Sequence, residues 1–396
     1  MVATIRDDFN KNFTPEKYKA FLDDLNSYHP GEIEFRVAET PVFIDKAFTK
    51  KLIDACEQIV DVIVRPDFKT LTESSIPSQV KMESENEHTD FIAFDFGICV
   101  DLNGIFSPQL IEMQGFPSLF AYQVLHNEVT RKHFHIPKGY HSYMNGFHKE
   151  SYLKLFKDLL TQDTTTENTI LLEIYPDQQK TRIDFRCTKD YTGIETVCLT
   201  KLKADGKKLY YEQDGRRIDI HRIYNRLIFD DFQKQILPEE TIDITRHWEV
   251  TWCSHPHWFY RISKFTLPFI DSPYVPKTYF LDKLDPIPED LENYVLKPLF
   301  SFAGQGVIID LTQEDIDAVT DKENWILQQK VQYADVIETP DIPAKCEIRV
   351  FYFWPKGAER PIAVQNLARL SKGKMIGVRY NADKEWVGGT QVFFEQ

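Results

Sequence analysis

Two short stretches of this chain carry side chains whose types and spacing suit phosphate and metal chemistry. Residues 294–307 read as a strand that delivers Lys297, followed by a loop of small residues at 303–306. Backbone amides in such a loop can approach a phosphate closely because glycine has no side chain. Glu112 and Gln114 lie two residues apart on another predicted strand, so both side chains point to one face. A cation near phosphates, with a carboxylate and an amide oxygen, is what a magnesium-nucleotide site needs.

The Glu112 strand belongs to a predicted β-hairpin. Residues 94–102 alternate apolar side chains with a second set that includes Asp95 and Asp101, and Asn103-Gly104 predicts the turn. Both aspartates then share the face of the hairpin that carries Glu112. Either one could complete a set of magnesium ligands, and the spacing does not choose between them.

Length and charge limit the classes of function. The chain has 396 residues, which predicts two or three lobes, and 42% of them are hydrophobic, enough for sizeable cores. The formal net charge is −14, which disfavours nucleic acid and anionic membranes as partners. Any basic patch must therefore be local, as at a phosphate site.

The sequence favours a cytoplasmic protein. It has no apolar run of about 18 residues that would predict a membrane span. The N-terminus lacks the apolar core of a signal peptide. The six cysteines form no CxxC and no spacing typical of a disulfide framework, so we expect reduced thiols.

Three regions follow from the pattern along the chain. Residues 1–165 combine helices with the hairpin, and residues 166–260 alternate strands and helices like a small Rossmann-like lobe that lacks GxGxxG. Residues 261–396 carry the Lys297 strand and further strands. The expected elements are helices over 14–26 and 48–64, a helix from the end of the hairpin to about residue 134, and a helix carrying Lys264. An extended segment is expected over 275–281, and strands over 169–175, 218–223, 325–331, 347–353, 362–369 and 375–381.

The order of these motifs resembles the ATP-grasp superfamily in a circularly permuted arrangement. In the usual order the metal-binding E-x-N strand comes last, whereas Glu112-Met-Gln114 comes about 180 residues before Lys297. That order resembles eukaryotic glutathione synthetase and glutathionylspermidine synthetase, and above all bacterial permuted ATP-grasp proteins. The resemblance covers residues 90–396 and implies an α/β fold with a Rossmann-like substrate lobe.

The resemblance also implies roles for individual residues. Nucleotide contacts are implied for Lys264, Lys297, Ser301, Ala303, Gly304, Gln305, Gly306, Gln328, Gln329, Lys330 and Val331. Metal ligands are implied for Glu112 and Gln114, completed by Asp95 or Asp101. Catalytic roles are implied for Arg349, in a strand similar to a "D-x-R" element, and for Arg369. Substrate contacts are implied for Ser118, Arg226, Arg379 and Asn381.

The implied function is ATP- and Mg²⁺-dependent ligation of a small carboxylate to an amine, peptide-like molecules among them, through an acylphosphate. Two departures keep alternatives open, because Gln114 stands where asparagine is usual and Ser301 where an acidic ligand is found. The alternatives are phosphoryl transfer without ligation, an ATP-binding module without catalysis, and a non-enzymatic scaffold. Arg349 has its own alternative, a surface ion pair with Glu347. The acid, the amine and the oligomeric state are not specified by the sequence.

Overall fold

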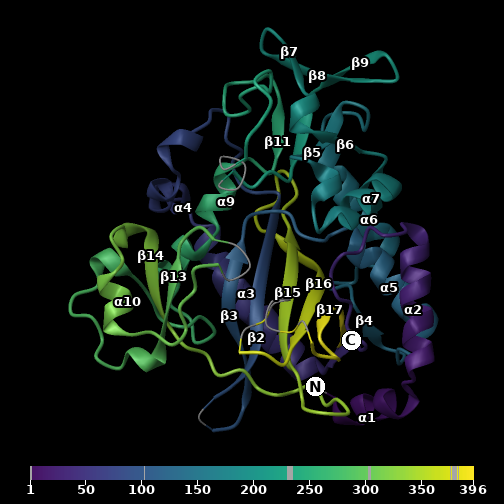
Figure 1. Ribbon diagram of the computed structural model, residues 1–396, viewed down its shortest axis with the longest axis vertical. Helices are drawn as coiled ribbons and strands as arrows, with labels where there is room; N and C mark the ends of the chain where they lie inside the picture. The colour runs from purple at the N-terminus through teal and green to yellow at the C-terminus, as the bar shows by residue number, and fades with distance from the viewer. Residues whose placement is uncertain are drawn as a thin grey trace.

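A five-stranded antiparallel sheet lies at the centre of the structure, a computed structural model that describes residues 2–101, 103–229, 235–301, 305–374, 376, 381 and 383–396 (Figure 1). The fold is mixed α/β with several sheets. The central strand order is β17-β16-β15-β2-β3, so hairpins from opposite ends of the chain share one sheet. The strands are β2 (Phe91–Val100), β3 (Phe106–Gln114), β15 (Lys345–Phe353), β16 (Ile362–Ser371) and β17 (Gly388–Thr390).

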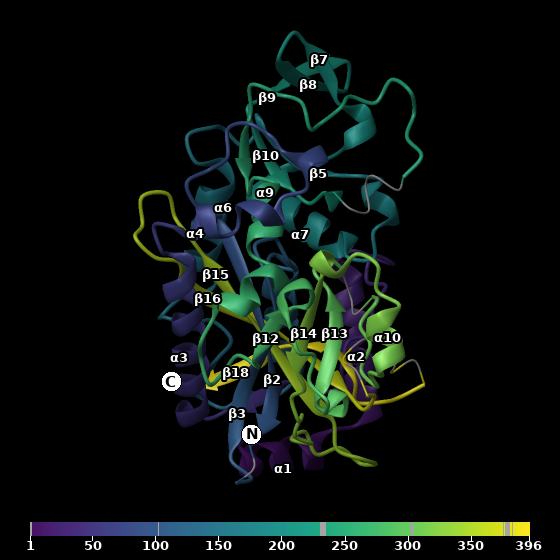
Figure 2. The same ribbon diagram turned by 90° about the vertical axis from the view of Figure 1, so that its left-hand side faces the viewer.

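One face of this sheet is covered by α3 (Lys46–Ile63). Asp45 caps the N-terminus of this helix, because its carboxylate accepts a hydrogen bond of 2.8 Å from the amide of Phe48. Its apolar stripe packs against the alternate apolar residues of the hairpin, as the period-two pattern predicts. The opposite face of the central sheet carries Glu112, Arg349 and Arg369, and we call it the charged face. It looks toward the sheet formed by β12 (Thr278–Phe280), β13 (Tyr294–Pro298) and β14 (Trp325–Gln329) (Figure 2).

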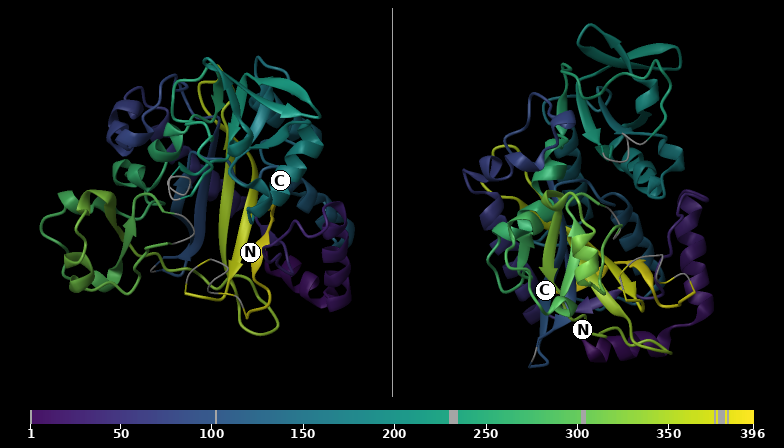
Figure 3. Two further views of the ribbon diagram at one scale, coloured as in Figure 1. Left: turned by 45° about the horizontal axis from the view of Figure 1, so that its top comes forward. Right: turned by 60° about the vertical axis from the view of Figure 1, so that its left-hand side comes forward.

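A second sheet is parallel, with the order β11-β10-β5-β6. Helices cover one face of it, and a small antiparallel meander projects beyond the other (Figure 3). The elements are β5 (Thr169–Glu173), β6 (Glu195–Cys198), β10 (Arg222–Asn225), β11 (Thr251–Cys253), α6 (Lys149–Thr161), α7 (Arg182–Thr192), and the meander β7 (Lys203–Asp205), β8 (Lys208–Gln213) and β9 (Arg216–Ile220). The chain leaves β5 toward β6 on one side and returns as β10 on the other, which makes a topological switch point between β5 and β10.

The expected single strand over 218–223 was wrong. Up to Ile220 the chain pairs antiparallel with β8, and from Arg222 it pairs in parallel with β5. The amides of His221 and Arg222 both donate to the carbonyl of Asn168, where the pairing partner changes. Periodicity along one segment does not reveal such an exchange of partners.

The third sheet is antiparallel, with the order β12-β14-β13, and has its own small core. Lys264 comes from a 3₁₀ segment, Lys264–Phe269, rather than an α-helix. The strands are β12 (Thr278–Phe280), β13 (Tyr294–Pro298) and β14 (Trp325–Gln329), accompanied by α10 (Gln313–Asp317). The expected segment 375–381 lies almost wholly outside the described residues.

The two ends of the chain meet beside the central sheet, where β1 pairs in parallel with β18. Thr14 caps α2 by accepting from the amide of Lys17, as its Thr-Pro-Glu start predicts. The remaining elements are α1 (Ala3–Asn12), α2 (Pro15–Tyr28), α4 (Phe68–Leu71), α5 (Tyr122–His133), α9 (His257–Arg261), β1 (Val42–Ile44), β4 (Tyr140–His141) and β18 (Val392–Glu395).

Two further observations concern the helices and the cysteines. Within the described part of the chain, every helix is too short or too polar to cross a bilayer. All six cysteines are buried with free thiols.

Gly97 generates the first prediction. A Cβ added there would lie 2.6 Å from Cε1 of Tyr333, whose ring covers this point of the sheet. Gly97→Ala should therefore lower the free energy of unfolding by about 1–3 kcal/mol, the usual range for overpacking. Chemical denaturation measures the change.

The matched control is Gly389→Ala, also in the central sheet. An added Cβ there has no described atom closer than 3.8 Å. Its free energy of unfolding should stay within about 0.5 kcal/mol of the wild type. Equal stability of the two variants would contradict the placement of the Tyr333 ring.

Candidate functional site

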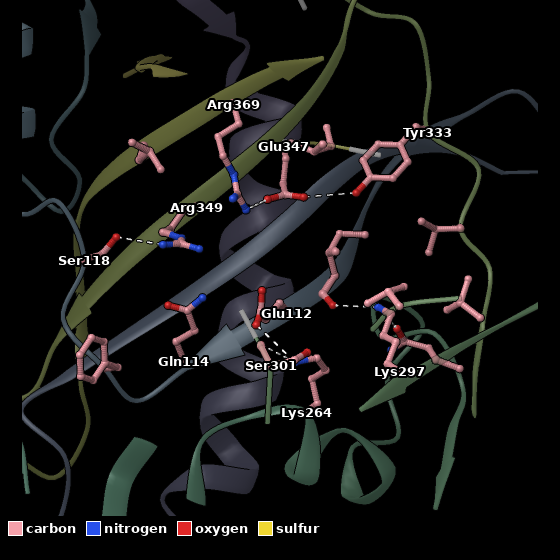
Figure 4. A pocket seen from close by; sticks show the side chains of 18 of the residues that line it. Glu112, Gln114, Ser118, Lys264, Lys297, Ser301, Tyr333, Glu347, Arg349 and Arg369 are labelled. Carbon is pink, nitrogen blue, oxygen red and sulfur yellow. Dashed lines mark hydrogen bonds and ion pairs between the residues drawn. The ribbon is translucent and has the colours of Figure 1, made fainter. Parts of the chain in front are cut away.

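A cavity of about 540 Å³ lies between the charged face of the central sheet and the β12–β14 sheet (Figure 4). Its lining comes from the central sheet, from the β12–β14 sheet and from the segments that follow β10 and precede α7. The expected site residues that line it are Glu112, Gln114, Ser118, Arg226, Lys264, Lys297, Ser301, Gln328, Gln329, Lys330, Val331, Arg349 and Arg369. Residues far apart in the sequence therefore share one pocket.

Strand register brings the charged residues together. Asp95 on β2 lies opposite Glu112 on β3 and opposite Arg349 on β15. The neighbouring row pairs Glu347 with Gly97 on one side and with Arg369 on the other. Directly opposed residues share a face of a sheet, so both rows point toward the cavity.

A β-bulge shapes the Glu112 end of the pocket. The register of β2 and β3 shifts after Asp95, which leaves Ile111 without an opposite residue. Both Ile111 and Glu112 then line the cavity, and the Ile111 carbonyl accepts a hydrogen bond of 3.3 Å from Nζ of Lys297. Bulges commonly re-aim side chains beside functional sites.

Two lysines face Glu112 from the other wall. Nζ of Lys297 donates to Oε1 of Gln328 at 2.6 Å. Nζ of Lys264 donates to the Ser301 carbonyl at 3.1 Å and lies 3.7 Å from Oε1 of Glu112. Burial, together with the charge of Lys264, lowers the pKa of Lys297 to about 8.

The pocket is strongly basic within an acidic protein. Among the described residues, seven lysine and arginine side chains line it, against two carboxylates, Glu112 and Glu347. The cationic residues are Arg226, Lys264, Lys297, Lys330, Arg349, Arg369 and Lys374. Such a cavity is suited to a polyanion.

Arg349 and Arg369 share a buried carboxylate. Nε and Nη2 of Arg349 each donate to an oxygen of Asp95 at 2.5 Å, and Nη2 of Arg369 donates to Asp95 at 2.8 Å. Arg369 also contacts Glu347, which accepts from the Tyr333 hydroxyl at 3.3 Å. The expected alternative for Arg349, a surface pair with Glu347, was wrong in partner and in burial, because Asp95 is only 1% exposed.

The far end of the pocket lies at the switch point of the parallel sheet. Arg226 follows β10, and its Nη1 donates to the Ser118 carbonyl at 2.7 Å. The Ser118 hydroxyl accepts from Nη1 of Arg349 at 2.9 Å. Thr181, which precedes α7, also lines this end. Ligands of open α/β sheets bind at such crevices.

The donor set offers magnesium a carboxylate and an amide oxygen, from Glu112 and Gln114. These fit the ion, because Mg²⁺ needs few protein ligands when phosphates and water supply the rest. Asp95 does not add to the set, since both of its oxygens accept from arginines. No group of three His, Cys, Asp or Glu residues suited to a metal occurs among the described residues.

Asp101, the other expected ligand, does not reach the pocket. It follows β2 at the tip of the hairpin, where its carboxylate accepts from the amides of Asn103 and Ile105 at 2.8 Å each. These hydrogen bonds, above all that of the Ile105 amide, lower the pKa of Asp101. Its role is to hold the turn, and the expectation of a metal ligand was wrong.

Residues 328–331, which the resemblance implies as nucleotide contacts, differ in what their side chains and amides contact. The Gln328 side chain is buried and holds Lys297 on one side and Thr278 on the other. The amides of Gln329 and Lys330 donate to carbonyls of neighbouring strands and loops. Among the described hydrogen bonds, the amide of Val331 has no acceptor, and Val331 lines the pocket.

Some expected residues lie elsewhere. Gln305 and Gly306 are exposed, and the pocket is lined instead by the following Val307 and Ile309. Asn381 is buried outside the lining and accepts from the amide of Lys372 at 2.9 Å. Ala303, Gly304 and Arg379 lie outside the described residues.

Sequence reasoning gave no pocket role to Tyr333, Glu347, Thr181, Ile228 or Leu367, which line it. Tyr333 lies two residues beyond the Val331 segment, a spacing that could have suggested a shared orientation. Leu367 and Arg369 also alternate on one strand. For Thr181 and Ile228 the sequence carries no local signal.

Comparison with known proteins adds a likeness of fold. No protein-family model matches the chain, and no curated protein matches it. A solved structure with a similar fold is a glutathione synthetase like-effector (GSS30) from Globodera pallida in its apo form. The two are 10% identical with a TM-score of 0.58, over 97% of this chain and 98% of that chain. At this identity the likeness shows a distant glutathione synthetase-like fold alone.

The lowered pKa of Lys297 generates the second prediction. Below its pKa of about 8 the side chain is charged and attracts anions, and above it the attraction is lost. ATP without metal serves as a polyanion whose own charge is constant in this range. Its affinity should fall about tenfold from about pH 7.5 to about pH 9.5, with uptake of a proton on binding at the higher pH.

Lys297→Arg is the matched control, because its charge persists through this range. Its affinity for ATP should be nearly independent of pH, while Lys297→Met should bind weakly at every pH. Calorimetry in buffers of different ionisation enthalpy measures both affinity and proton uptake. A pH dependence unchanged in Lys297→Arg would remove Lys297 as the titrating group.

Proposed function

We propose that this protein is an ATP- and Mg²⁺-dependent ligase that joins a carboxylate to an amine, built as a circularly permuted ATP-grasp. The observation that carries the proposal is the lining of one basic pocket, where Lys264 and Lys297 face Glu112 and two arginines lie beyond it. A polyphosphate chain between lysines and a carboxylate-held metal is the arrangement that phosphoryl transfer requires.

The order of the two walls along the chain supports the permuted assignment. The Glu112 hairpin precedes the Lys297 strand, yet both line the same pocket. The glutathione synthetase-like fold of the solved structure agrees with this assignment without extending to activity.

The nucleotide would lie along the β12–β14 wall. The amide of Val331, which has no acceptor among the described hydrogen bonds, would donate to a base edge, and apolar side chains such as Val295 and Ile309 also line this wall. Lys297 and Lys264 would then neutralise phosphate oxygens.

Glu112 and Gln114 would hold the metal. The metal held there would offset the negative charge that develops on the transferring phosphoryl group. The Lys264 ammonium lies 3.7 Å from Oε1 of Glu112, so it also offsets the charge of this carboxylate.

The chemistry has two steps. A carboxylate oxygen of the acid attacks the γ-phosphorus of ATP, and the bond to the ADP oxygen breaks, which yields an acylphosphate. The amine nitrogen then attacks the acyl carbon, inorganic phosphate leaves, and a proton is released. Arg349 and Arg369 are placed to stabilise charge on the phosphoryl group through preorganised N–H donors.

The acid and the amine would enter from the switch-point end. Arg226 and Ser118 lie there with Arg349, and together they suit an anionic group of the substrate. Phe116 and Ile228 line the same end and suit an apolar body. The class of substrate is therefore a small carboxylate with apolar surface.

One observation favours the second candidate, an ATP-binding protein without ligase activity. Asp95 is engaged by two arginines and Glu347 by Arg369, so among the described carboxylates of the pocket only Glu112 is left without an arginine partner. Metal-dependent release of ADP separates the two candidates.

The metal assignment gives the third prediction. Glu112→Ala should raise the Mg²⁺ concentration needed for half-maximal binding of a non-hydrolysable ATP analogue by on the order of tenfold or more, because a full charge is lost. Gln114→Ala should have a smaller effect, and Gln114→Asn should behave like the wild type. Fluorescence titration with magnesium measures these values.

Asp101→Ala is the control carboxylate of the same hairpin. It should leave the Mg²⁺ requirement unchanged and lower the free energy of unfolding slightly through the loss of turn hydrogen bonds. A normal Mg²⁺ requirement in Glu112→Ala would show that the hairpin does not hold the metal.

The ligase activity itself gives the fourth prediction. ADP release with pooled carboxylates and amines should require both substrates and magnesium. Arg349→Lys keeps a charge beside Asp95 but loses the bidentate fork, so ATP should bind within about twofold of normal while turnover falls about a hundredfold or more. ADP release that no pool stimulates would favour the non-catalytic candidate, and near-normal turnover in Arg349→Lys would make Arg349 structural.

A further inference from the structure

Asp95 occupies an unusual place for a carboxylate in a basic pocket. Its side chain is 1% exposed. It lies on β2, which pairs with β3, the strand of Glu112, on one side and with β15, the strand of Arg349, on the other. Both oxygens face guanidinium groups, with a two-point contact to Arg349 and a single contact to Arg369. A fork-to-fork pair of this kind sets the plane of the guanidinium as well as its distance.

The geometry leaves donors of Arg349 directed at the cavity. Its Nε and one hydrogen of Nη2 are used by Asp95, and one hydrogen of Nη1 by Ser118. A guanidinium has five N–H groups, so two have no acceptor among the described residues and are available to a ligand. Glu347 is the other buried carboxylate of the cluster, and it contacts Arg369 without contacting Arg349.

We propose that Asp95 is the positioning residue that orients Arg349 and Arg369 toward the transferring phosphoryl group, and that it is not a metal ligand. The inference rests on the proposed function, since it presumes that a phosphoryl group enters this pocket. Asp95 acts through the two arginines and touches neither nucleotide nor metal.

Charge alone makes the opposite prediction, which gives the idea a sharp test. Removal of one negative charge leaves the cluster more positive, so electrostatics alone would tighten the binding of every anion. Loss of orientation instead weakens only complexes that need the arginines at a defined angle, such as a mimic of the transition state.

The experiment compares two probes in Asp95→Asn. AMP-PNP with Mg²⁺ represents the ground state, and ADP with aluminium fluoride and Mg²⁺ represents the transferring phosphoryl group. We expect AMP-PNP affinity to be unchanged or tighter, the aluminium fluoride complex to weaken about tenfold or more, and the Mg²⁺ requirement to stay that of the wild type. Glu347→Gln, the matched buried carboxylate, should weaken the aluminium fluoride complex less, because Arg349 keeps its fork.

Two results would overturn the inference. Equal or tighter binding of the aluminium fluoride complex in Asp95→Asn would mean that Asp95 acts by charge or packing alone. A raised Mg²⁺ requirement would make it a metal ligand. If Asp95→Asn does not fold, Asp95→Glu keeps the charge but displaces the fork by one methylene, and the same comparison applies. Failure of the wild type to bind AMP-PNP would instead overturn the proposed function.

Discussion

The pairing register of β2 with its two neighbours is the constraint on which the site depends. It sets Asp95 opposite both Arg349 and Glu112, so a guanidinium, a buried carboxylate and the carboxylate proposed to bind the metal form one row across the sheet. A slip of one residue would turn Asp95 into the α3 core and put phenylalanine in the pocket. The core therefore enforces the register, because the apolar side chains of this strand pack under α3.

Buried ion pairs and hydrogen bonds hold the pocket's cations in place without any ligand. Lys297 is held by Gln328 and the Ile111 carbonyl, and Arg349 by Asp95 and Ser118. Donors fixed in advance need little reorganisation when charge develops, which is the main electrostatic advantage of an enzyme site. The cost of burial is visible in the lowered pKa of Lys297.

The second sheet contributes to the same pocket through its switch point. Arg226 and Thr181 follow a strand and precede a helix there, and they line the end opposite the lysines. The cavity thus has one end suited to a polyphosphate and another suited to a small anion with apolar surface. A shared fold with a glutathione synthetase like-effector does not specify which molecule binds there, because function resides in the site.

Local pattern alone identified the hairpin, α2, α3, and the residues Glu112, Gln114 and Lys297, because alternation and helical spacing report which side chains share a face. It could not choose between Asp95 and Asp101, which lie on the same predicted face. Only the pairing of β2 with β15, from the far end of the chain, brings Arg349 to Asp95, whereas Asp101 is held in the turn by hydrogen bonds from the nearby amides of Asn103 and Ile105. Tertiary contacts also determine where β9 ends and β10 begins, because β9 pairs with β8 and β10 pairs with β5. The sequence of the segment does not specify these partners.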